Sequence, residues 1–473
     1  MAKRGDVAPK LLVIFGITGD LARKMTFRAL YRLERRELLN CPILGVASDD
    51  ITSQELVNRA RAAISGTGED LDDEVFDRLA GRLSYLHGDV TDAALYRTLA
   101  EQIGAGHADE DRQILYYLEM PPALFAPIVE NLGRVGLLAH SRVAVEKPFG
   151  HDLASARDLN ARLRAVLRED QILRVDHFLG KQPVADLEYL RFANTALAEL
   201  WDRTTIAEIQ ITMAEDFGVK DRGKFYDAVG ALRDVVQNHL LQVLALVAME
   251  PPVGPSDDDL NDKKAEVFRA MPALDPAHYV RGQYRGYRDI DGVAQDSQTE
   301  TFVAMRLEIE NWRWAGVPIF LRAGKALPER VTEVRLFTRR VPVLGFLPER
   351  ERAERNQIVL RIDPDPGMRL QLIAQGGDSW RNVHLDSSFS VDLGEPILPY
   401  ERLLHAGLVG DRQLFAREDS IEETWRIVQP LLDNPGNVHP YEPGSWGPEA
   451  AQALVHGHRK WQEPWLPGSS DSR

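Results

Sequence analysis

The chain has 473 residues and a mass of 53.2 kDa. At about 150 residues per domain, this length predicts two or three domains. Its net charge of −15 argues against binding to nucleic acid or anionic membranes, because an acidic protein repels phosphate groups. The longest apolar-looking stretch, Leu240 to Met249, is too short to span a membrane. One cysteine, Cys41, rules out an intrachain disulfide and favours a reducing, cytoplasmic location.

The first part of the chain, from Lys10 to Leu179, alternates short β-rich runs with helical stretches. We expect strands at LLVIF, PILGVA, RLSYLHGDV, RQILYYLEM, RVAVEKPF and QILRVD, which start at residues 11, 42, 82, 112, 142 and 171. The residues between them have helical periodicity, as in 152–167. This alternation predicts βαβ units and a doubly wound parallel sheet, with ligands bound at the carboxyl edge of the strands.

The pattern changes after about residue 200. The alternation Ile-Gln-Ile-Thr-Met at 209–213 predicts a strand with one wet face, and a long apolar helix is expected at about 225–250. Strand-like runs then cluster at 301–375, which predicts an α+β domain with a large, mostly antiparallel sheet flanked by helices. We expect an exposed acidic loop at 253–264 and disorder at 468–473.

A glycine turn follows the first predicted strand directly. Its residues, which lead into a helix, are Gly16, Ile17, Thr18, Gly19, Asp20 and Leu21. A strand, glycine turn and helix in this order can bring backbone N–H groups to a pyrophosphate, and the helix N-terminus adds favourable charge. The spacing is G-x-x-G rather than G-x-G-x-x-G, so an ordinary tight turn before a helix stays open as the alternative.

The end of the second predicted strand carries Ser48, Asp49 and Asp50. This position usually decides which nicotinamide dinucleotide a domain of this kind prefers. A carboxylate there would accept a hydrogen bond from a ribose 2′-hydroxyl and repel a 2′-phosphate. The alternative is that both carboxylates are solvated turn residues, with Arg23 and Lys24 supplying compensating positive charge.

A second motif, Asp-His-Phe-Leu-Gly-Lys, follows the sixth predicted strand at 176–181. If a helix starts here, His177 and Lys181 lie on one face, because they are four residues apart. Two cationic or hydrogen-bonding groups at a helix start suit a phosphate monoester. The alternative is that Asp176 caps the helix and Lys181 is simply exposed.

Polar residues interrupt the long apolar helix at Arg233, Asp234, Gln237, Asn238 and His239. Buried polar groups need partners, which are either internal or supplied by a polyhydroxyl ligand such as a sugar. Around an ideal α-helix, Asp234 and His239 lie about 140° apart, so both reach one ligand only if it lies along the helix flank. His239 is a candidate general base, since histidine titrates near neutrality, and a carboxylate from the other domain, such as Asp176, would orient it.

Together and in this order, these segments resemble glucose-6-phosphate dehydrogenases over nearly the whole chain. The matching motifs are GITGDLARKMTFRALYRL from Gly16, VEKPFG from Val145, RVDHFLGK from Arg174, ALRDVVQNHLLQVLALVAMEPP from Ala231 and GVPIFLRAGKALPER from Gly316, followed by PYERLLHAGLVGD and WRIVQPLL. The motifs RVDHFLGK and RDVVQNHLL are specific to this family, which makes the ordinary structural alternatives given above far less plausible in combination.

The resemblance implies a Rossmann-like dinucleotide-binding domain over residues 1–180 and a substrate-binding and oligomerisation α+β domain over 181–473. It also implies oxidation of glucose 6-phosphate at C1 to 6-phospho-glucono-1,5-lactone, with hydride transfer to NADP or NAD, as the first step of the oxidative pentose phosphate pathway. The protein would be a homodimer or homotetramer. The competing hypotheses are a catalytically retired sensor of dinucleotide and sugar phosphate, and a different sugar oxidoreductase.

Site residues are also implied by the resemblance. His239 resembles the general base and Asp176 its carboxylate partner. His177 and Lys181 resemble phosphate ligands, and Lys147 lies where cofactor and substrate meet, before a Pro148 that we expect to be cis. Further substrate contacts are expected from Glu215, Asp234, Lys325 and Arg330. Cofactor contacts are expected from Gly16, Thr18, Gly19, Asp20, Leu21, Ser48, Asp89, Val90 and Lys147.

Three departures from the family pattern bear on affinity. Phe178 stands where the family usually has Tyr, so one hydroxyl contact to phosphate is lost, worth about 1 kcal/mol. Ser48 stands where the family often has Arg, and Met25 where it has a further basic residue. Loss of a charge-assisted bond to the 2′-phosphate costs roughly 1.5–3 kcal/mol, or about ten- to hundredfold in affinity. We therefore predict a weakened NADP preference and use of NAD.

Overall fold

A computed structural model describes residues 11–104, 113–342, 355–376, 379–390, 394 and 397–466, so the disorder predicted at 468–473 lies outside the described residues. The chain divides into two compact units, which we call the first and the second unit. The first comprises Met1–Gln182, Pro252–Asn261 and Ile397–Glu422, and the second comprises Pro183–Pro251, Asp262–Pro396 and Glu423–Arg473. Within the described ranges, no helix combines the length and apolar character that a membrane crossing requires.

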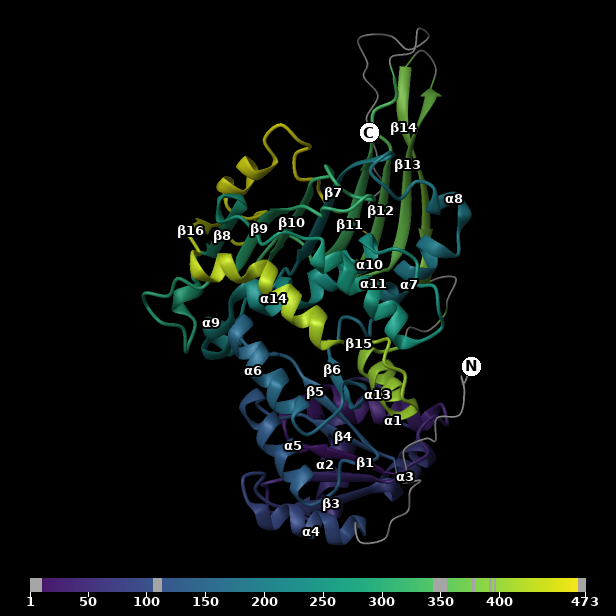
Figure 1. The fold of residues 1–473 in the computed structure, drawn as a ribbon, viewed down its shortest axis with the longest axis vertical. Coiled ribbons are helices and arrows are strands. Elements are labelled where there is room, and N and C mark those ends of the chain that lie inside the picture. The colour runs from purple at the N-terminus through teal and green to yellow at the C-terminus, as the bar shows by residue number, and fades with distance from the viewer. Residues whose placement is uncertain are drawn as a thin grey trace. The chain divides into compact units, whose positions relative to one another are not determined.

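The first unit contains a sheet of seven described strands in the order β15-β6-β5-β4-β1-β2-β3 (Figure 1). All neighbours pair in parallel except β15, which runs antiparallel to β6. The doubly wound parallel sheet predicted from the sequence is therefore confirmed. The strands are β1 (Leu11–Phe15), β2 (Ile43–Ala47), β3 (Leu83–His87), β4 (Ile114–Leu118), β5 (Ser141–Glu146), β6 (Ile172–Val175) and β15 (Phe415–Ala416).

Helices connect these strands, and acceptor side chains define where several of them begin. Thr52 forms a capping box with Glu55 at the start of α2, and Asp72, Asp92 and Asp152 accept hydrogen bonds from the first backbone N–H groups of α3, α4 and α6. The helical segments are η1 (Ala22–Thr26), α1 (Phe27–Arg35), α2 (Ser53–Ser65), α3 (Asp73–Arg82), α4 (Ala93–Ile103), η2 (Pro122–Leu124), α5 (Phe125–Arg134), α6 (Leu153–Arg164), η3 (Glu169–Gln171) and α13 (Pro399–Val409).

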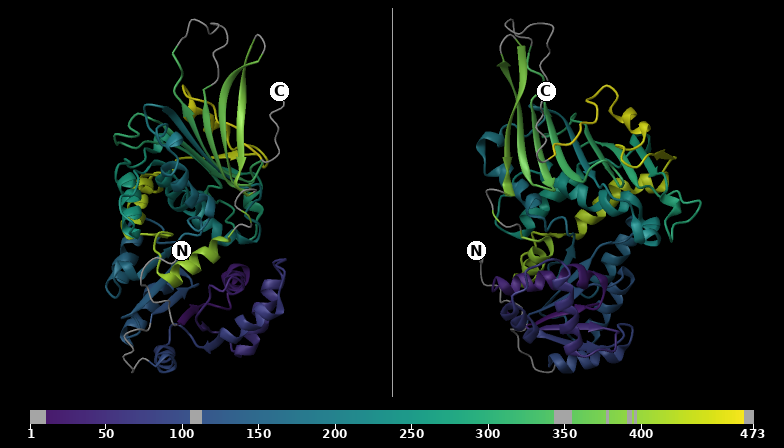
Figure 2. Two further views of the ribbon diagram at one scale, coloured as in Figure 1. Left: turned by 90° about the vertical axis from the view of Figure 1, so that its right-hand side faces the viewer. Right: turned by 180° about the vertical axis from the view of Figure 1, so that it is seen from behind.

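The second unit contains a sheet of nine described strands in the order β14-β13-β12-β11-β7-β10-β9-β8-β16. Neighbours are antiparallel except at β10–β7 and β16–β8, which confirms the mostly antiparallel sheet. The β13–β14 hairpin extends well beyond the other strands of this sheet (Figure 2). The strands are β7 (Ile206–Ala214), β8 (Tyr279–Tyr284), β9 (Phe302–Leu307), β10 (Ile319–Gly324), β11 (Val331–Thr338), β12 (Gln357–Asp363), β13 (Gly367–Gly376), β14 (Ser379–Ser388) and β16 (Val438–Tyr441).

The helices of the second unit include the segment that carries the predicted catalytic histidine. Buried indole N–H groups tie them to their surroundings, since Trp201 Nε1 donates to Val247 O and Trp314 Nε1 donates to Ala248 O, both at 2.7 Å. The helical segments, of which α7, α11 and α14 begin in the first unit, are α7 (Gln182–Phe192), α8 (Thr195–Ala198), η4 (Lys220–Arg222), α9 (Gly223–Ala231), η5 (Leu232–Leu240), α10 (Leu241–Ala248), α11 (Asp257–Arg269), η6 (Pro276–His278), η7 (Tyr287–Asp289), α14 (Glu418–Asp433) and η8 (Glu449–Val455).

The wet face predicted for β7 is wrong. Gln210 and Thr212 are only 3% and 5% exposed, because the C-terminal segment at 459–466 covers their side of the sheet. Gln210 Nε2 donates to the carbonyls of Arg459 and Lys460, and its Oε1 accepts from the backbone N–H of Gln462. Gln210 therefore binds the backbone of this segment, and the Thr212 hydroxyl accepts a hydrogen bond from Arg322 Nε at 3.0 Å, so this face is not exposed to water.

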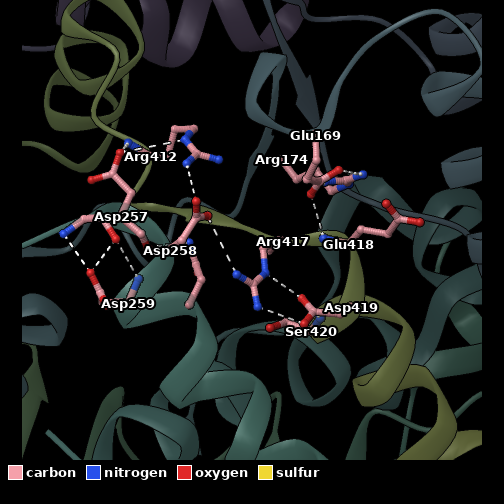
Figure 3. A network of polar contacts seen from close by, with 12 residues as sticks. Glu169, Arg174, Asp257, Asp258, Asp259, Arg412, Arg417, Glu418, Asp419 and Ser420 are labelled. Carbon is pink, nitrogen blue, oxygen red and sulfur yellow. Dashed lines mark hydrogen bonds and ion pairs between the residues drawn. The ribbon is translucent and has the colours of Figure 1, made fainter. Parts of the chain in front are cut away.

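The exposed acidic loop predicted at 253–264 is also wrong, because most of it forms the first turns of α11. Asp257 Oδ2 accepts from the backbone N–H of Arg412 at 2.9 Å, and Asp258 pairs with the guanidinium groups of Arg412 and Arg417 at 3.0 and 3.7 Å (Figure 3). Acidic residues in a first helical turn are also stabilised by the helix dipole. Leu260 is buried, which anchors the helix.

The single long helix predicted at about 225–250 is broken into α9, η5 and α10. Gly230 interrupts it with φ of 71° and ψ of 170°, a conformation that disfavours any other residue. A Cβ at Gly230 would also lie 2.5 Å from Glu300 Oε1. Glu300 in turn accepts a hydrogen bond from the backbone N–H of Leu232 at 3.1 Å, so it caps the segment that follows the break.

Candidate active site

The glycine turn lies where ligand-binding crevices form in doubly wound sheets. The strand order reverses between β1 and β4, and the crevice opens outside the carboxyl ends of those two strands. Gly16 follows β1 with φ of 83°, and a Cβ there would lie 2.3 Å from the carbonyl oxygen of Glu119, which follows β4. Gly19 N donates to Gly16 O at 2.8 Å, which closes the turn. Only glycine allows the chain to approach so closely, so the predicted dinucleotide turn has the required shape.

The helix after this turn begins with a π-helical segment, η1, which carries two cations. Arg23 and Lys24 both pair with the turn residue Asp20, at 2.7 and 3.2 Å. The hydrogen bond from Arg23, followed by that from Lys24, lowers the pKa of Asp20. Leu21, the remaining predicted contact of the turn, is half-buried and ends it.

The carboxylate after β2 is held in place rather than simply solvated. Asp49 Oδ2 lies 3.2 Å from Arg59 Nη1 of α2, and a hydrogen bond from the Thr18 hydroxyl is the main cause that lowers the pKa of Asp49. Ser48 and Asp50 beside it are exposed. Asp49, at the end of β2, therefore bonds to Thr18 of the glycine turn, so two regions that are predicted to contact the cofactor are connected.

The loop after β3 carries the other predicted cofactor contacts of this half of the sheet. Asp89 Oδ1 accepts from the backbone N–H and the hydroxyl of Thr91, both at 2.8 Å, and these bonds lower the pKa of Asp89. Val90 is buried. Asp89 is thus an ordered, exposed acceptor at the carboxyl edge of the sheet.

The turn after β5 has the geometry that the resemblance implied. The Lys147–Pro148 peptide bond is cis, which confirms that expectation. Glu146, which precedes it, is buried and accepts a hydrogen bond from Tyr117 Oη at 2.5 Å. Burial raises the pKa of Glu146 to about 7, against the lowering effects of Tyr117 and Lys147.

The predicted helix start at 176–181 is wrong, because α7 begins only at Gln182. The segment instead forms consecutive turns, in which the N–H groups of Leu179, Gly180 and Lys181 donate to carbonyls three residues earlier. Asp176 is buried and accepts from the backbone N–H of Phe178 at 2.9 Å, so the alternative of a capping Asp is close to what is found, with a turn in place of a helix.

Aromatic rings position the two predicted phosphate ligands of this segment. The His177 ring stacks on Tyr400, with centroids 6.3 Å apart and planes inclined by 5°. Lys181 Nζ lies 4.3 Å above the centre of the Phe178 ring, a distance typical of a cation–π contact. The phenyl ring that replaces the family tyrosine therefore holds the lysine, although it has no hydroxyl to offer.

His239 and Asp234 lie on a π-helical segment, η5, and this changes their relation. In a π-helix, backbone hydrogen bonds join residues five apart, as in the bond from Leu241 N to Val236 O. Residues 234 and 239 are also five apart, so the angle between them around the helix axis is much smaller than the 140° expected for an α-helix. His239 is 2% exposed and Asp234 is half-buried. The expectation that Asp234 and His239 lie about 140° apart around the helix is therefore wrong.

The predicted sugar ligands of the second unit gather around a tyrosine that the sequence analysis missed. Lys325 forms an ion pair with Glu215, and Lys325 Nζ lies 5.2 Å from the centre of the Tyr226 ring. Burial raises the pKa of Tyr226 well above its ordinary value, and Asp234 and Glu215 raise it further. The Tyr226 hydroxyl is buried without a hydrogen-bond partner among the described residues.

Two residues of interest remain, which are Arg330, a predicted substrate ligand of the second unit, and Glu119 of the first unit. Arg330 is exposed and pairs with Asp363 at 3.0 Å. Glu119, which the sequence analysis also missed, accepts a hydrogen bond from Thr26 Oγ1 at 2.5 Å beside the glycine turn. Its place directly after β4, at the reversal of strand order, is the signal that would have singled it out. Tyr226 offered no such signal, because tyrosines are common in buried helices.

Comparison with known proteins places the whole chain in one family. The family model described as glucose-6-phosphate dehydrogenase, NAD binding domain, matches residues 13–186, and the C-terminal domain model of the same family matches residues 188–462. The chain is 76% identical over 472 residues to "Glucose-6-phosphate 1-dehydrogenase 1" of Mycobacterium tuberculosis, with 100% of both chains covered.

Solved structures agree with this assignment. The crystal structure of glucose-6-phosphate 1-dehydrogenase from Mycobacterium avium matches with a TM-score of 0.92 and 75% identity, over 98% of this chain and 100% of that one. A glucose-6-phosphate dehydrogenase in complex with its substrate glucose-6-phosphate matches with a TM-score of 0.90 and 32% identity, with the same coverage. The chain therefore belongs to the glucose-6-phosphate dehydrogenase family.

Proposed function

We propose that this protein oxidises glucose 6-phosphate at C1 to 6-phospho-glucono-1,5-lactone, the first step of the oxidative pentose phosphate pathway. The observation that carries the proposal is the 76% identity to named glucose-6-phosphate 1-dehydrogenases over the full length of both chains. The second unit supports it, since Glu215, Lys325 and Tyr226 form a polar cluster beside Asp234 that suits a polyhydroxyl ligand.

In the proposed mechanism, His239 removes the proton from the C1 hydroxyl while C1 loses hydride. Asp176 holds the imidazole in the correct tautomer and stabilises the imidazolium that forms. When bound, the nicotinamide dinucleotide accepts the hydride. Lys147, beside the cis peptide bond, contacts both ligands, and the remaining groups position the sugar phosphate, which lowers the entropic barrier to reaction. These groups are His177, Lys181, Glu215, Asp234, Lys325 and Arg330.

The cofactor in this proposal is NADP, with NAD as a second acceptor. The family model for the NAD binding domain matches residues 13–186, and the Gly16 turn has the shape that a pyrophosphate requires. NAD use follows from Ser48, which offers a 2′-phosphate no cation. The residues expected to contact the dinucleotide are Gly16, Thr18, Gly19, Asp20, Leu21, Ser48, Asp89, Val90 and Lys147. A cytoplasmic location stays a prediction from the single, buried Cys41.

The purified protein is expected to reduce NADP, and NAD less efficiently, when glucose 6-phosphate is added. The rise in absorbance of the reduced nicotinamide measures both rates, and glucose and fructose 6-phosphate are the control substrates. A retired sensor would bind glucose 6-phosphate without turnover, and another sugar oxidoreductase would prefer one of the controls. Strong NADP selectivity with Ser48 unaltered would contradict the argument from Ser48.

We further propose that the protein is a homodimer or homotetramer that assembles through the large sheet. The β13–β14 hairpin places apolar side chains on one exposed face, because Leu372 is paired with Val383 and Leu370 with Leu385. Val383 is 40% and Leu385 59% exposed, which is unusual for strand residues of this size. A second copy of the same hairpin face would cover them.

Leu385→Asp is expected to shift the protein from its oligomer to the monomer, because a carboxylate would be buried at the contact. Sedimentation velocity measures the change. Val253→Asp is the control, since Val253 is 93% exposed but belongs to the first unit, whereas the hairpin belongs to the second. A wild-type monomer, or equal oligomers for wild type and Leu385→Asp, would contradict this assembly.

A further inference from the structure

A pocket of about 520 Å³ opens beside the glycine turn, between η1 and α2 of the first unit. Its lining combines the turn residues Thr18 and Gly19 with three cationic side chains, those of Arg23, Lys24 and Arg59. None of the described residues that line it is acidic. A pocket with this lining suits an anion attached to a nucleotide that also contacts the glycine turn.

Arg59 lies near the place where a strand-end cation would be expected. In dinucleotide-binding domains, a 2′-phosphate is accommodated by an arginine near the end of the second strand, and a carboxylate there instead selects the free 2′-hydroxyl. Here Asp49 provides the carboxylate and Ser48 no charge. Arg59 reaches that position from the second turn of α2, with Nη1 3.2 Å from Asp49 Oδ2.

The ion pair between Arg59 and Asp49 is open to exchange. The side chains are 48% and 46% exposed, and pairs at such exposure contribute little to stability. A phosphate brings more charge than a carboxylate and can form two parallel hydrogen bonds with a guanidinium group. The second anion near the pocket, Asp20, is already engaged by Arg23 and Lys24. The described lining itself therefore carries positive charge and no carboxylate, although Asp20, Asp49 and Glu55 lie close to these cations.

We propose that Arg59 is the residue that selects NADP, binding the 2′-phosphate in exchange for Asp49, while the Thr18 hydroxyl and Lys24 flank the phosphate. This inference rests on the proposed use of a nicotinamide dinucleotide. In the same arrangement, Asp49 accepts a hydrogen bond from the 2′-hydroxyl of NAD. One pair of side chains then serves both cofactors, and Arg59 replaces the strand-end arginine that Ser48 has displaced.

Direct binding of two nucleotide fragments tests the proposal without turnover. Arg59→Ala is expected to weaken adenosine 2′,5′-bisphosphate about 10- to 100-fold relative to AMP in calorimetric titrations. Arg59→Lys keeps the charge but not the paired hydrogen bonds, so an intermediate loss is expected. Asp49→Asn removes the competing carboxylate and is expected to tighten the bisphosphate and weaken the preference for a free 2′-hydroxyl.

Arg61→Ala is the matched control. Arg61 lies on the same helix and is 42% exposed, but it pairs with Asp73 at 2.6 Å and does not line the pocket. In kinetics, the ratio of kcat/KM for NADP to that for NAD is expected to fall at least tenfold in Arg59→Ala and to stay constant in Arg61→Ala.

Equal binding ratios for wild type, Arg59→Ala and Arg61→Ala would overturn the role of Arg59, even if the enzyme oxidises glucose 6-phosphate. A wild-type protein that binds the bisphosphate but never oxidises the sugar phosphate would instead contradict the proposed function. The binding ratio would still decide whether Arg59 recognises the 2′-phosphate.

Discussion

His239→Asn is expected to lower kcat by about 10³-fold or more, with KM for glucose 6-phosphate and for NADP changed only a few-fold. A positioned general base contributes about 10² to 10⁴ in rate, and asparagine can still donate and accept hydrogen bonds without taking a proton. His239 is 2% exposed, so bulk water has little access to replace the lost base. Initial rates with both substrates varied separate kcat from KM.

His278→Asn, an exposed histidine of the same unit, is the control for the loss of an imidazole. The acidic limb of the pH profile is the second readout, because protonation of the base should slow the wild type as the pH falls through the pKa of histidine. That limb is expected to disappear from the residual activity of His239→Asn and to persist in His278→Asn. Near-normal turnover in His239→Asn would remove His239 from the role of base.

The π-helical form of η5 shows why the sequence predicted the residues of the site better than their arrangement. The residue types in Arg-Asp-Val-Val-Gln-Asn-His indicate chemistry in a helix otherwise suited to burial. Whether Asp234 and His239 share a side depends on the helix type, which nothing local in the sequence specifies. The break at Gly230 depends on Glu300, a residue 70 positions away that caps the new helix start.

Other differences have the same cause, which is a partner distant in sequence. From the sequence alone, Asp257 and Asp258 predict a solvated loop, but in the structure Arg412 and Arg417 supply the opposite charge. Likewise, Gln210 predicts a strand face exposed to water, but the backbone at 459–462 covers it. In contrast, β1 occupies the predicted residues 11–15, because a run of five apolar residues before a glycine turn depends on no distant partner. Local patterns therefore predicted the parallel strands of the first unit, whereas long-range pairing decided the surfaces of the elements and where some helices begin or break.

Glu119→Gln is expected to make the first unit less sensitive to pH between about 5 and 8, and more stable at the upper end. Glu119 Oε2 is out of contact with solvent and has no hydrogen-bond partner among the described residues, although the residue as a whole is partly exposed. Ionisation would leave this buried oxygen with a share of the negative charge and no hydrogen-bond donor to stabilise it. Burial raises the pKa of Glu119 from 4.5 to about 8, with a smaller contribution from Glu146 and against the hydrogen bond from Thr26.

Among the described residues, the side chains that act on this carboxyl are uncharged or acidic, so none of them offers it positive charge. Glu146 comes from β5, Tyr117 from β4 and Tyr400 from α13, and each is itself kept protonated longer by burial. Glu119 also lies beside Gly16, where the dinucleotide pyrophosphate is expected, and a neutral carboxyl avoids repulsion there. We therefore expect the native protein to hold a proton on Glu119 at neutral pH.

The sign of the stability change follows from proton counts. Between pH 4.5 and 8 the native state keeps a proton on Glu119 that the unfolded chain has lost, so unfolding releases a proton and the free energy of unfolding falls as the pH rises. Each pH unit in this window lowers that free energy by about 1.4 kcal/mol, so the loss amounts to about 3–5 kcal/mol by pH 8. Glutamine keeps the acceptor for Thr26 but cannot ionise, so Glu119→Gln should lack this loss.

Amide hydrogen exchange in β4 measures this free energy in the first unit, whereas all eight tryptophans lie in the second unit and would report on that one. Protection of β4 in wild type and Glu119→Gln is compared at each pH, which cancels the intrinsic pH dependence of exchange. The difference is expected to grow from near zero at pH 5 to its full value near pH 8. The exposed Glu101→Gln on α4 should follow the wild type throughout. A difference that stays constant across this range would show that Glu119 is ionised in the native protein at neutral pH, because only a proton held by the native state makes the two curves diverge.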